Sequence, residues 1–169
     1  QDARDLPRRV TTLQVTGNNS VGGGKVTLDG GTFQSALGIL SFSNPFAINA
    51  TGGAIDVLVG GVTLSGGLAD GNGAGTLTKI GAGTLVLSGN STYSGGTTVS
   101  SGTLQLGTAT IAGNIVGSVA VSSNGSFNLT NTTIPGVTTI SNEGFMVVSN
   151  ASSLGNATVT GGGGIEFLN

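Results

Sequence analysis

The sequence predicts an all-β chain, a β-solenoid whose turns take about 19–27 residues, and three observations lead to this fold class. First, 33 of the 169 residues are glycine and only 3 are proline, which suits many tight corners better than a compact globule. Second, apolar residues recur with a period of two in short runs bounded by glycine, serine or asparagine, as in short β-strands. Third, these runs repeat along the chain at the length of one solenoid turn.

The first nine residues differ in composition from the rest of the chain. They hold five of its twelve charged side chains: Asp2, Arg4, Asp5, Arg8 and Arg9. We interpret residues 1–9 as a charged N-terminal arm, either a solvated tail or a cap over the first turn. Residues 10–169 are predicted to form the solenoid domain, as a segment of a longer or assembled rod. A sharper hypothesis makes Arg4, Arg8 and Arg9 a docking arm for a partner.

The N-terminal half repeats at a constant offset. Residues 26–33 align with residues 48–55 (48 − 26 = 22), and the same offset places residues 75–77 on residues 53–55 (75 − 53 = 22). In a solenoid, each aligned strand stacks on its counterpart in the preceding turn at a spacing of about 4.8 Å. Aligned apolar positions therefore become columns of inward side chains. A jelly roll or sandwich also has many short strands, but fixed offsets favour the solenoid.

The middle of the chain, residues 75–107, reads GTLTKIGAGTLVLSGNSTYSGGTTVSSGTLQLG. Strand patterns occupy residues 76–80, 84–88 and 97–106. The interval from Gly75 to Gly102 (102 − 75 = 27) is longer than the other repeats. An extra excursion is therefore expected near residues 90–95, with Tyr93 on it.

This stretch resembles the passenger-associated repeat of bacterial autotransporters, whose pattern is roughly LTKxGxGTLxLxGxNTYxGxTxVxxGTLxL. The matching residues are Leu77-Thr78-Lys79, Gly81-Ala82-Gly83-Thr84-Leu85, Ser88-Gly89-Asn90, Thr92-Tyr93-Ser94-Gly95 and Gly102-Thr103-Leu104. The resemblance covers about thirty of the 169 residues. It implies a right-handed parallel β-helix on a secreted passenger. It also implies an extracellular or cell-surface location, associated with a Gram-negative-type outer membrane.

The C-terminal part is the most regular. Residues 102–106 align with residues 125–129 at an offset of 23. After them, four columns keep one constant offset (140 − 121 = 19): Val121, Ile140 and Val159; Gly125, Gly144 and Gly163; Phe127, Met146 and Ile165; Leu129, Val148 and Phe167. The valine–isoleucine column and the column that begins at Phe127 are predicted to be buried.

The sequence predicts no catalytic, cofactor-binding or metal-binding site, and hence no enzyme. It has no histidine or cysteine, which removes the usual nucleophile–base pairs and most zinc sites. The repeats hold the carboxylates Asp29, Asp56, Asp70, Glu143 and Glu166. Their aligned positions are Thr51 for Asp29, Thr78 for Asp56, Gly162 for Glu143 and Val147 for Glu166, so no two carboxylates stack on adjacent turns. A corner excursion could still bring Asp70 and Lys79 together.

Charge and hydropathy restrict the partners. The net charge is −2 and no basic stripe is present, so nucleic acid is not expected as a partner. No run approaches about 18 apolar residues, so no transmembrane segment is predicted. The leading hypothesis is a secreted or cell-surface structural or adhesive protein, a stalk or interaction scaffold. An accessory structural subunit of a larger extracytoplasmic complex is the alternative, and a carbohydrate-active enzyme ranks last.

The ends of the solenoid are the expected contact sites. The last strand pattern is apolar, carries one charge and includes Ile165, Phe167 and Leu168. An open strand edge can pair with another chain. We therefore expect either that the chain continues beyond Asn169 or that this edge binds a protein partner or a second copy. A host or cell-surface glycan is a further candidate ligand.

Overall fold

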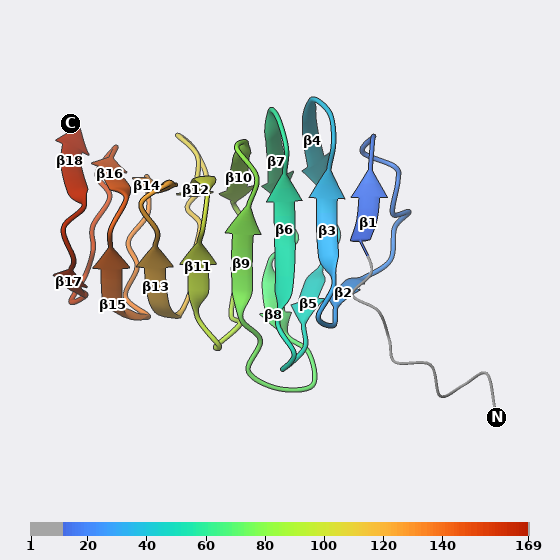
Figure 1. The fold of residues 1–169 in the computed structure, drawn as a ribbon, viewed down its shortest axis with the longest axis horizontal. Helices are drawn as coiled ribbons and strands as arrows, with labels where there is room; N and C mark the ends of the chain where they lie inside the picture. Colours follow the sequence, from blue (N-terminus) through green and yellow to red (C-terminus); the bar gives the residue numbers. More distant parts are fainter. Residues whose placement is uncertain (1–11, 169) are drawn as a thin grey trace.

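A computed structural model describes residues 12–168, which coil into a rod of stacked strands (Figure 1). All the strand pairings are parallel, as in the pairs at residues 32–35 with 54–57 and at residues 145–149 with 164–168. No helix occurs among the described residues. The structure therefore confirms the predicted all-β chain and the parallel β-solenoid.

Within residues 12–168, eighteen strands form three sheets, which are the walls of the rod. Sheet A contains, in spatial order, β1 (Thr12–Val15), β3 (Thr32–Ser35), β6 (Gly53–Val57), β9 (Leu77–Ile80), β11 (Thr97–Val99), β13 (Gly117–Val121), β15 (Val137–Asn142) and β17 (Thr158–Thr160). Sheet C contains β4 (Ile39–Phe42), β7 (Gly61–Leu64), β10 (Thr84–Leu87), β12 (Gly102–Leu106), β14 (Gly125–Thr130), β16 (Phe145–Ser149) and β18 (Gly164–Leu168). Sheet B contains β2 (Val26–Leu28), β5 (Phe46–Ile48) and β8 (Leu68–Asp70).

Each complete turn visits sheet A, then sheet C, then sheet B. The offset between paired residues of successive strands in sheet A is smallest from Ser141 to Thr160 (160 − 141 = 19) and largest from Ala54 to Thr78 (78 − 54 = 24). The eight strands of this sheet span about 34 Å at the usual strand spacing. In the later turns the third wall is reduced to isolated bridges, such as the one between Asn90 and Asn114.

Alternation along the strands puts the apolar residues inside the rod. In β10 and β12, Leu85, Leu87, Leu104 and Leu106 are fully buried, while the residues between them are partly exposed. In the wider N-terminal turns, each wall contributes one phenylalanine. The ring of Phe33 in sheet A meets Phe42 of sheet C and Phe46 of sheet B edge to face, with ring centroids 5.4 and 5.3 Å apart. Edge-to-face contact is a favoured arrangement for aromatic rings.

Most of the C-terminal register follows the sequence alignment. Residues 102–106 pair with residues 125–129, as predicted. The columns Phe127–Met146–Ile165 and Leu129–Val148–Phe167 are both present. The valine–isoleucine column was wrong at its first member. Ile140 pairs with Val159 but also with Val119, and Val121 pairs with Asn142, because the β13–β15 pairing shifts between Gly117 and Val119.

The N-terminal alignment was right between β3 and β6, and wrong by two residues between β2 and β5 and between β6 and β9. Thr32 and Phe33 pair with Ala54 and Ile55, as predicted. In contrast, residues 26–28 pair with residues 46–48, and Leu77 pairs with Gly53. The cause is the corner that leads from sheet B to sheet A, which lengthens by two residues in each turn. Its paired flanking residues are Leu28 and Thr32, then Ile48 and Ala54, then Asp70 and Thr78, which are 4, 6 and 8 positions apart.

The expected excursion at residues 90–95 was also wrong, because this segment belongs to the wall of the rod. The amide of Thr92 donates to the carbonyl of Leu68 at 2.7 Å, and the amide of Ser91 donates to the carbonyl of Asn114 at 3.2 Å. Tyr93 is fully buried, and its hydroxyl lies 2.6 Å from Thr97 Oγ1.

The interval from Gly75 to Gly102 is long because its ends lie on different walls: Gly75 precedes β9 of sheet A, whereas Gly102 begins β12 of sheet C. The turn itself, from Leu77 to Thr97, takes 20 residues (97 − 77 = 20). Two longer connections do occur, in the corner at residues 71–76 and in the loop at residues 107–113. The first of these is the long loop between β8 and β9 in Figure 1.

Candidate interaction surfaces and buried polar groups

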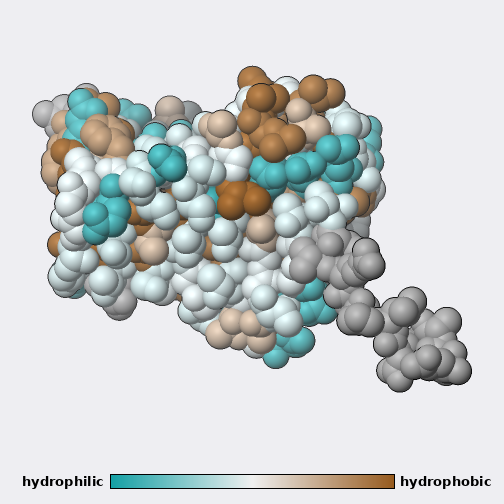
Figure 2. Space-filling model, viewed as in Figure 1, coloured by the Kyte–Doolittle hydropathy of each residue, from teal (hydrophilic) through white to brown (hydrophobic). Residues whose placement is uncertain are grey.

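The outer surface of the rod is mainly neutral. The outer column of sheet A is made of small hydroxyl and methyl side chains: Thr12, Thr32, Ala54, Thr78, Thr98, Ala120, Ser141 and Thr160. Figure 2 shows a broad pale surface with an apolar patch above it, over the corners that join β3 to β4 and β6 to β7. We call this patch the corner ridge, and it consists of Leu37, Ile39, Leu58 and Val59. No pattern in the sequence predicted this patch.

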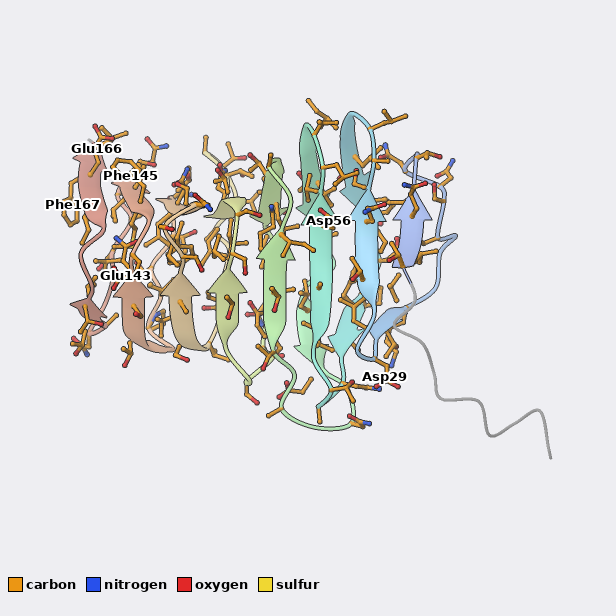
Figure 3. All side chains as sticks on the ribbon, in the orientation of Figure 1. Asp29, Asp56, Glu143, Phe145, Glu166 and Phe167 are labelled. Carbon is orange, nitrogen blue, oxygen red and sulfur yellow. The ribbon has the colours of Figure 1, made fainter. Side chains whose placement is uncertain are left out.

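In residues 12–168, the carboxylates lie on different strands or corners, and all but Glu166 accept a hydrogen bond from a nearby group. Figure 3 shows Asp29 and Asp56 in the N-terminal half of the rod, and Glu143 and Glu166 near its C-terminal end. Thr51 Oγ1 donates to Asp29 at 2.6 Å, and the amide of Gly162 donates to Glu143 at 3.4 Å, as their alignment predicted. Glu166 pairs with Val147, also as predicted. Asp56 pairs with Ile80 and not with Thr78, because of the longer corner described above.

Asp70 fastens the loop at residues 71–75 to the following turn. Ser94 Oγ donates to its carboxylate at 2.6 Å, and the amides of Gly75 and Ser94 each donate at 2.9 Å. The hydrogen bond from the Ser94 hydroxyl, followed by those from the two amides, lowers the pKa of Asp70. Asp70 and Lys79 bind different groups, so the approach weighed from the sequence does not form a reactive pair.

Lys79 is a buried ammonium group that the sequence pattern did not reveal. It lies in the inward column between Ile55 and Val99 and is fully buried. Its Nζ donates to the carbonyls of Ile80, Gly81 and Ser101 at 2.7, 2.9 and 3.2 Å. The aliphatic part of the Lys79 side chain thus packs in the core, while its ammonium group links two successive corners through these hydrogen bonds. Burial lowers the pKa of Lys79 to about 8, and the negative charge of Asp56 opposes this shift.

A ladder of amides crosses the outer face of the first three strands of sheet A. Gln14 Nε2 donates to Gln34 Oε1 at 2.8 Å, and Gln34 Nε2 donates to Asp56 Oδ2 at 2.8 Å. This ladder satisfies the carboxylate of Asp56, which is only 8% exposed. The arrangement is structural, because each of the two hydrogen bonds links one turn to the next.

The N-terminal edge of sheet C has a cover that sequence analysis missed. The first turn has no strand in this sheet, and residues 16–25 arch over β4 instead. Asn18 Oδ1 accepts from the amide of Ser41 at 2.8 Å, and Asn44 Nδ2 donates to the carbonyls of Gly22 and Gly24 at 3.0 and 2.6 Å. A hollow of about 240 Å³ remains beneath the arch, lined mainly by neutral amide, hydroxyl and backbone groups. In the sequence, the cluster of Asn and Gly residues at positions 17–24 was the feature that could have predicted this arch.

The predicted C-terminal contact edge is the outermost strand of sheet C. Ile165 and Phe167 end the two inward columns of this sheet, and both are exposed because no further turn covers them. Leu168 alternates onto the outer face and is also exposed. Phe167 is 67% exposed and lies at the end of the rod in Figure 3. The predicted docking arm, Arg4, Arg8 and Arg9, falls outside the described residues.

In residues 12–168, no group of three or more acidic, histidine or cysteine side chains could hold a metal ion. The same part of the chain has no helix of the length and apolar character that would cross a membrane.

Residues 77–106 match the family model of the passenger-associated-transport-repeat. The match runs from β9 to β12 and includes the wall segment with Tyr93 and the buried Lys79. It confirms the resemblance found in the same stretch of sequence. No curated protein and no solved structure matches the chain. The repeat and the parallel β-solenoid fit an autotransporter-passenger-like protein, and this repeat family implies a secreted or cell-surface protein of Gram-negative bacteria.

Proposed function

We propose that this chain is a rod-shaped scaffold in an autotransporter-type passenger, a stalk that presents adhesive contacts at the bacterial surface. The observation that carries the proposal is the continuous parallel register from β1 to β17, which contains a passenger repeat at residues 77–106. Such a rod has one unbroken apolar core and many equivalent outer positions. These properties suit the display of contacts at a distance, because each turn adds about 4.8 Å of length.

The surface chemistry supports a binding role over a catalytic one. The carboxylates lie on different strands or corners, and those of Asp29, Asp56, Asp70 and Glu143 accept hydrogen bonds from hydroxyls, amides or backbone groups. A pair of carboxylates that cleaves a glycosidic bond stands within about 5–10 Å across the substrate. We therefore place the chain among interaction proteins.

We place one partner contact at the C-terminal edge, where β18 offers an unpaired strand side and the apolar residues Ile165, Phe167 and Leu168. A further strand would add its backbone hydrogen bonds to sheet C and cover the two inward columns. This strand addition is a common mode of protein recognition at sheet edges. The strand would come from a continuation of the chain, a protein partner or a second copy.

Thiol labelling of intact cells tests the location. The chain has no cysteine, so a single Thr110→Cys change in the exposed loop at residues 107–113 gives one reactive thiol in the chain. Cells that produce the full-length protein should react at this position with a membrane-impermeant maleimide. Ile115→Cys is the matched control, because Ile115 is fully buried and should stay unlabelled in the folded chain. Labelling of the Thr110→Cys protein only after lysis would contradict a surface location.

Deletion of one turn tests the scaffold role. Thr98 pairs with Ala120, so removal of residues 98–119 joins equivalent positions and keeps the register. Cells with this deletion should keep at least half of their adhesion to host cells, whereas removal of residues 98–108 should abolish both folding and adhesion. Turnover of a pectin-like or glucan substrate that Asp56→Asn or Asp70→Asn abolishes would overturn the scaffold role.

A further inference from the structure

The corner ridge is an apolar surface on the side of the rod. Its four side chains are Leu37, Ile39, Leu58 and Val59, which are 61%, 83%, 40% and 54% exposed. They come from two stacked corners that lead from sheet A to sheet C. The amide of Leu58 donates to the carbonyl of Ser35, and the amide of Gly61 donates to that of Gly38, each at 3.1 Å. These bonds hold the four side chains as one fixed patch (Figure 2).

The geometry of the corner does not require apolar side chains. The tight turns are made by Gly38 and Gly60, whose φ angles are 71° and 72°. The equivalent corners of later turns carry serine at residues 100–101 and 122–123, and Glu143 in the turn after these. The exposed aliphatic side chains are therefore a property of this surface and not of the fold. Contiguous apolar patches of this kind mark interaction sites.

The ridge and its borders are electrically neutral. The four ridge residues carry no charge, and the nearest ionisable group along the chain, Asp56, is almost buried and bonded to Gln34. Gln34 borders the ridge on sheet A, and the hydroxyls of Ser41 and Thr63 border it on sheet C. Amides and hydroxyls both donate and accept hydrogen bonds. A rim of such groups can pair with a rotated copy of itself, whereas a charged rim would repel its copy.

We propose that the corner ridge binds the corner ridge of a second copy, so that two rods associate side by side about a two-fold axis. In such a contact the same patch serves both chains. Each ridge has only four apolar side chains, so the contact is smaller than a standard protein interface and corresponds to a weak, reversible dimer. The low net charge of −2 also limits repulsion between copies. This contact is independent of the strand edge at β18.

A lipid surface is the other possible occupant of an exposed apolar ridge. Proteins that rest on membranes combine apolar side chains with lysine or arginine beside them. In residues 12–168 the cations are Lys25 and Lys79, and neither belongs to the ridge or its rim. Lys79 is buried and its ammonium is bound to three carbonyls. The charge pattern therefore favours a second copy.

Cross-linking tests the dimer in the Phe167→Lys background, which suppresses association through the end of the rod. Ile39→Cys places a thiol at the centre of the ridge, and Ile111→Cys places one at another exposed apolar position, outside the ridge. Under mild oxidation, we expect the Ile39→Cys chain to form covalent dimers at least tenfold faster than the Ile111→Cys chain. In sedimentation equilibrium, Ile39→Lys should weaken dimerisation at least tenfold, and Ile111→Lys should leave it unchanged.

Equal cross-linking rates for the two cysteine variants would overturn the proposal. So would a chain that stays monomeric at millimolar concentration with Ile39 intact. Flotation with phosphatidylcholine vesicles is the third readout. If the chain floats with the vesicles and Ile39→Lys abolishes this, the ridge binds lipid and the dimer proposal is wrong. Circular dichroism of each variant establishes that the strands are intact.

Discussion

At the scale of single residues, the core contains one hydroxyl that the fold leaves unsatisfied. Ser35 is fully buried between Val15 and Val57 in one inward column, and its Oγ has no hydrogen-bond partner in the described part of the chain. A buried hydroxyl without a partner costs free energy, so its removal stabilises the fold. We predict that Ser35→Ala raises the free energy of unfolding by about 1 kcal/mol, measured by equilibrium denaturation.

Ser91 supplies the matched control, because it is also fully buried but accepts a hydrogen bond from the amide of Leu68 at 3.3 Å. The same substitution there leaves a buried amide unpaired. Ser91→Ala should therefore lower the free energy of unfolding by about 1 kcal/mol. A loss of stability of equal size in both variants would contradict the description of Ser35.

Lys79 gives the fold a dependence on pH. Its pKa is lowered to about 8 in the folded chain, mainly by burial, against 10.5 for an unperturbed lysine. Between these values the unfolded chain binds more protons than the folded chain, so the free energy of unfolding rises as pH rises. Relative to Lys79→Met, the wild-type chain should gain on the order of 1 kcal/mol between pH 7 and pH 9.5.

Denaturation of both chains at several pH values measures this difference. The series ends below pH 10, because burial raises the pKa of Tyr93 and its unfolded form begins to ionise there, which destabilises the fold. A difference between the two chains that is flat or falls with pH would show that the ammonium of Lys79 is not desolvated.

At the scale of strands, the inward columns decide whether the turns stack. Ile140 lies in β15 between Val119 and Val159 and is fully buried. Ile140→Asp would bury an unpaired charge and should destabilise the rod by roughly 3–5 kcal/mol. Thr139→Asp on the same strand is the control, since Thr139 is exposed. It should change the melting temperature little. Equal effects at the two positions would show that the strand is inverted.

The strand pattern was predictable from sequence because two signals agree, the period of two and the repeated offsets. Both N-terminal misalignments and the error at Val121 were two residues in size. A register shift of two residues keeps every side chain on the same face of the sheet. An alternation of period two therefore cannot reveal such a shift. Corner length and the irregularity between Gly117 and Val119 set the true register, and neither leaves an apolar signature in the sequence.

The surfaces were less predictable than the strands. The exposure of Ile165, Phe167 and Leu168 follows from their place in β18, and their role as a contact edge stays a prediction. The corner ridge and the arch at residues 16–25 depend on which corners stack and on which strand is absent from the first turn. The burial of Tyr93 and Lys79 could not be predicted from the sequence pattern. It depends on hydrogen-bond partners that neighbouring segments supply, among them Thr97 for the Tyr93 hydroxyl and Ser101 for the Lys79 ammonium.

At the scale of the whole molecule, the end of the rod should control association along its axis. We predict that the 169-residue chain associates in a concentration-dependent manner and that Phe167→Lys reduces this association, because a charge would enter the exposed end of an apolar column. Analytical ultracentrifugation measures the effect. Glu166→Lys, which changes the outer face of the same strand, is the control. Association that persists unchanged in Phe167→Lys would exclude this edge as the contact.

The central claim is that the turns stack in parallel with the register described, and distances along the outer column of sheet A test it most directly. One spin label replaces Thr32, and the second replaces Ala120, Ser141 or Thr160, which lie 4, 5 and 6 strands away in the same column. Pulsed electron paramagnetic resonance should then give distances near 19, 24 and 29 Å, rising by about 4.8 Å per strand. Three distances that do not increase in this order would contradict the stacked rod.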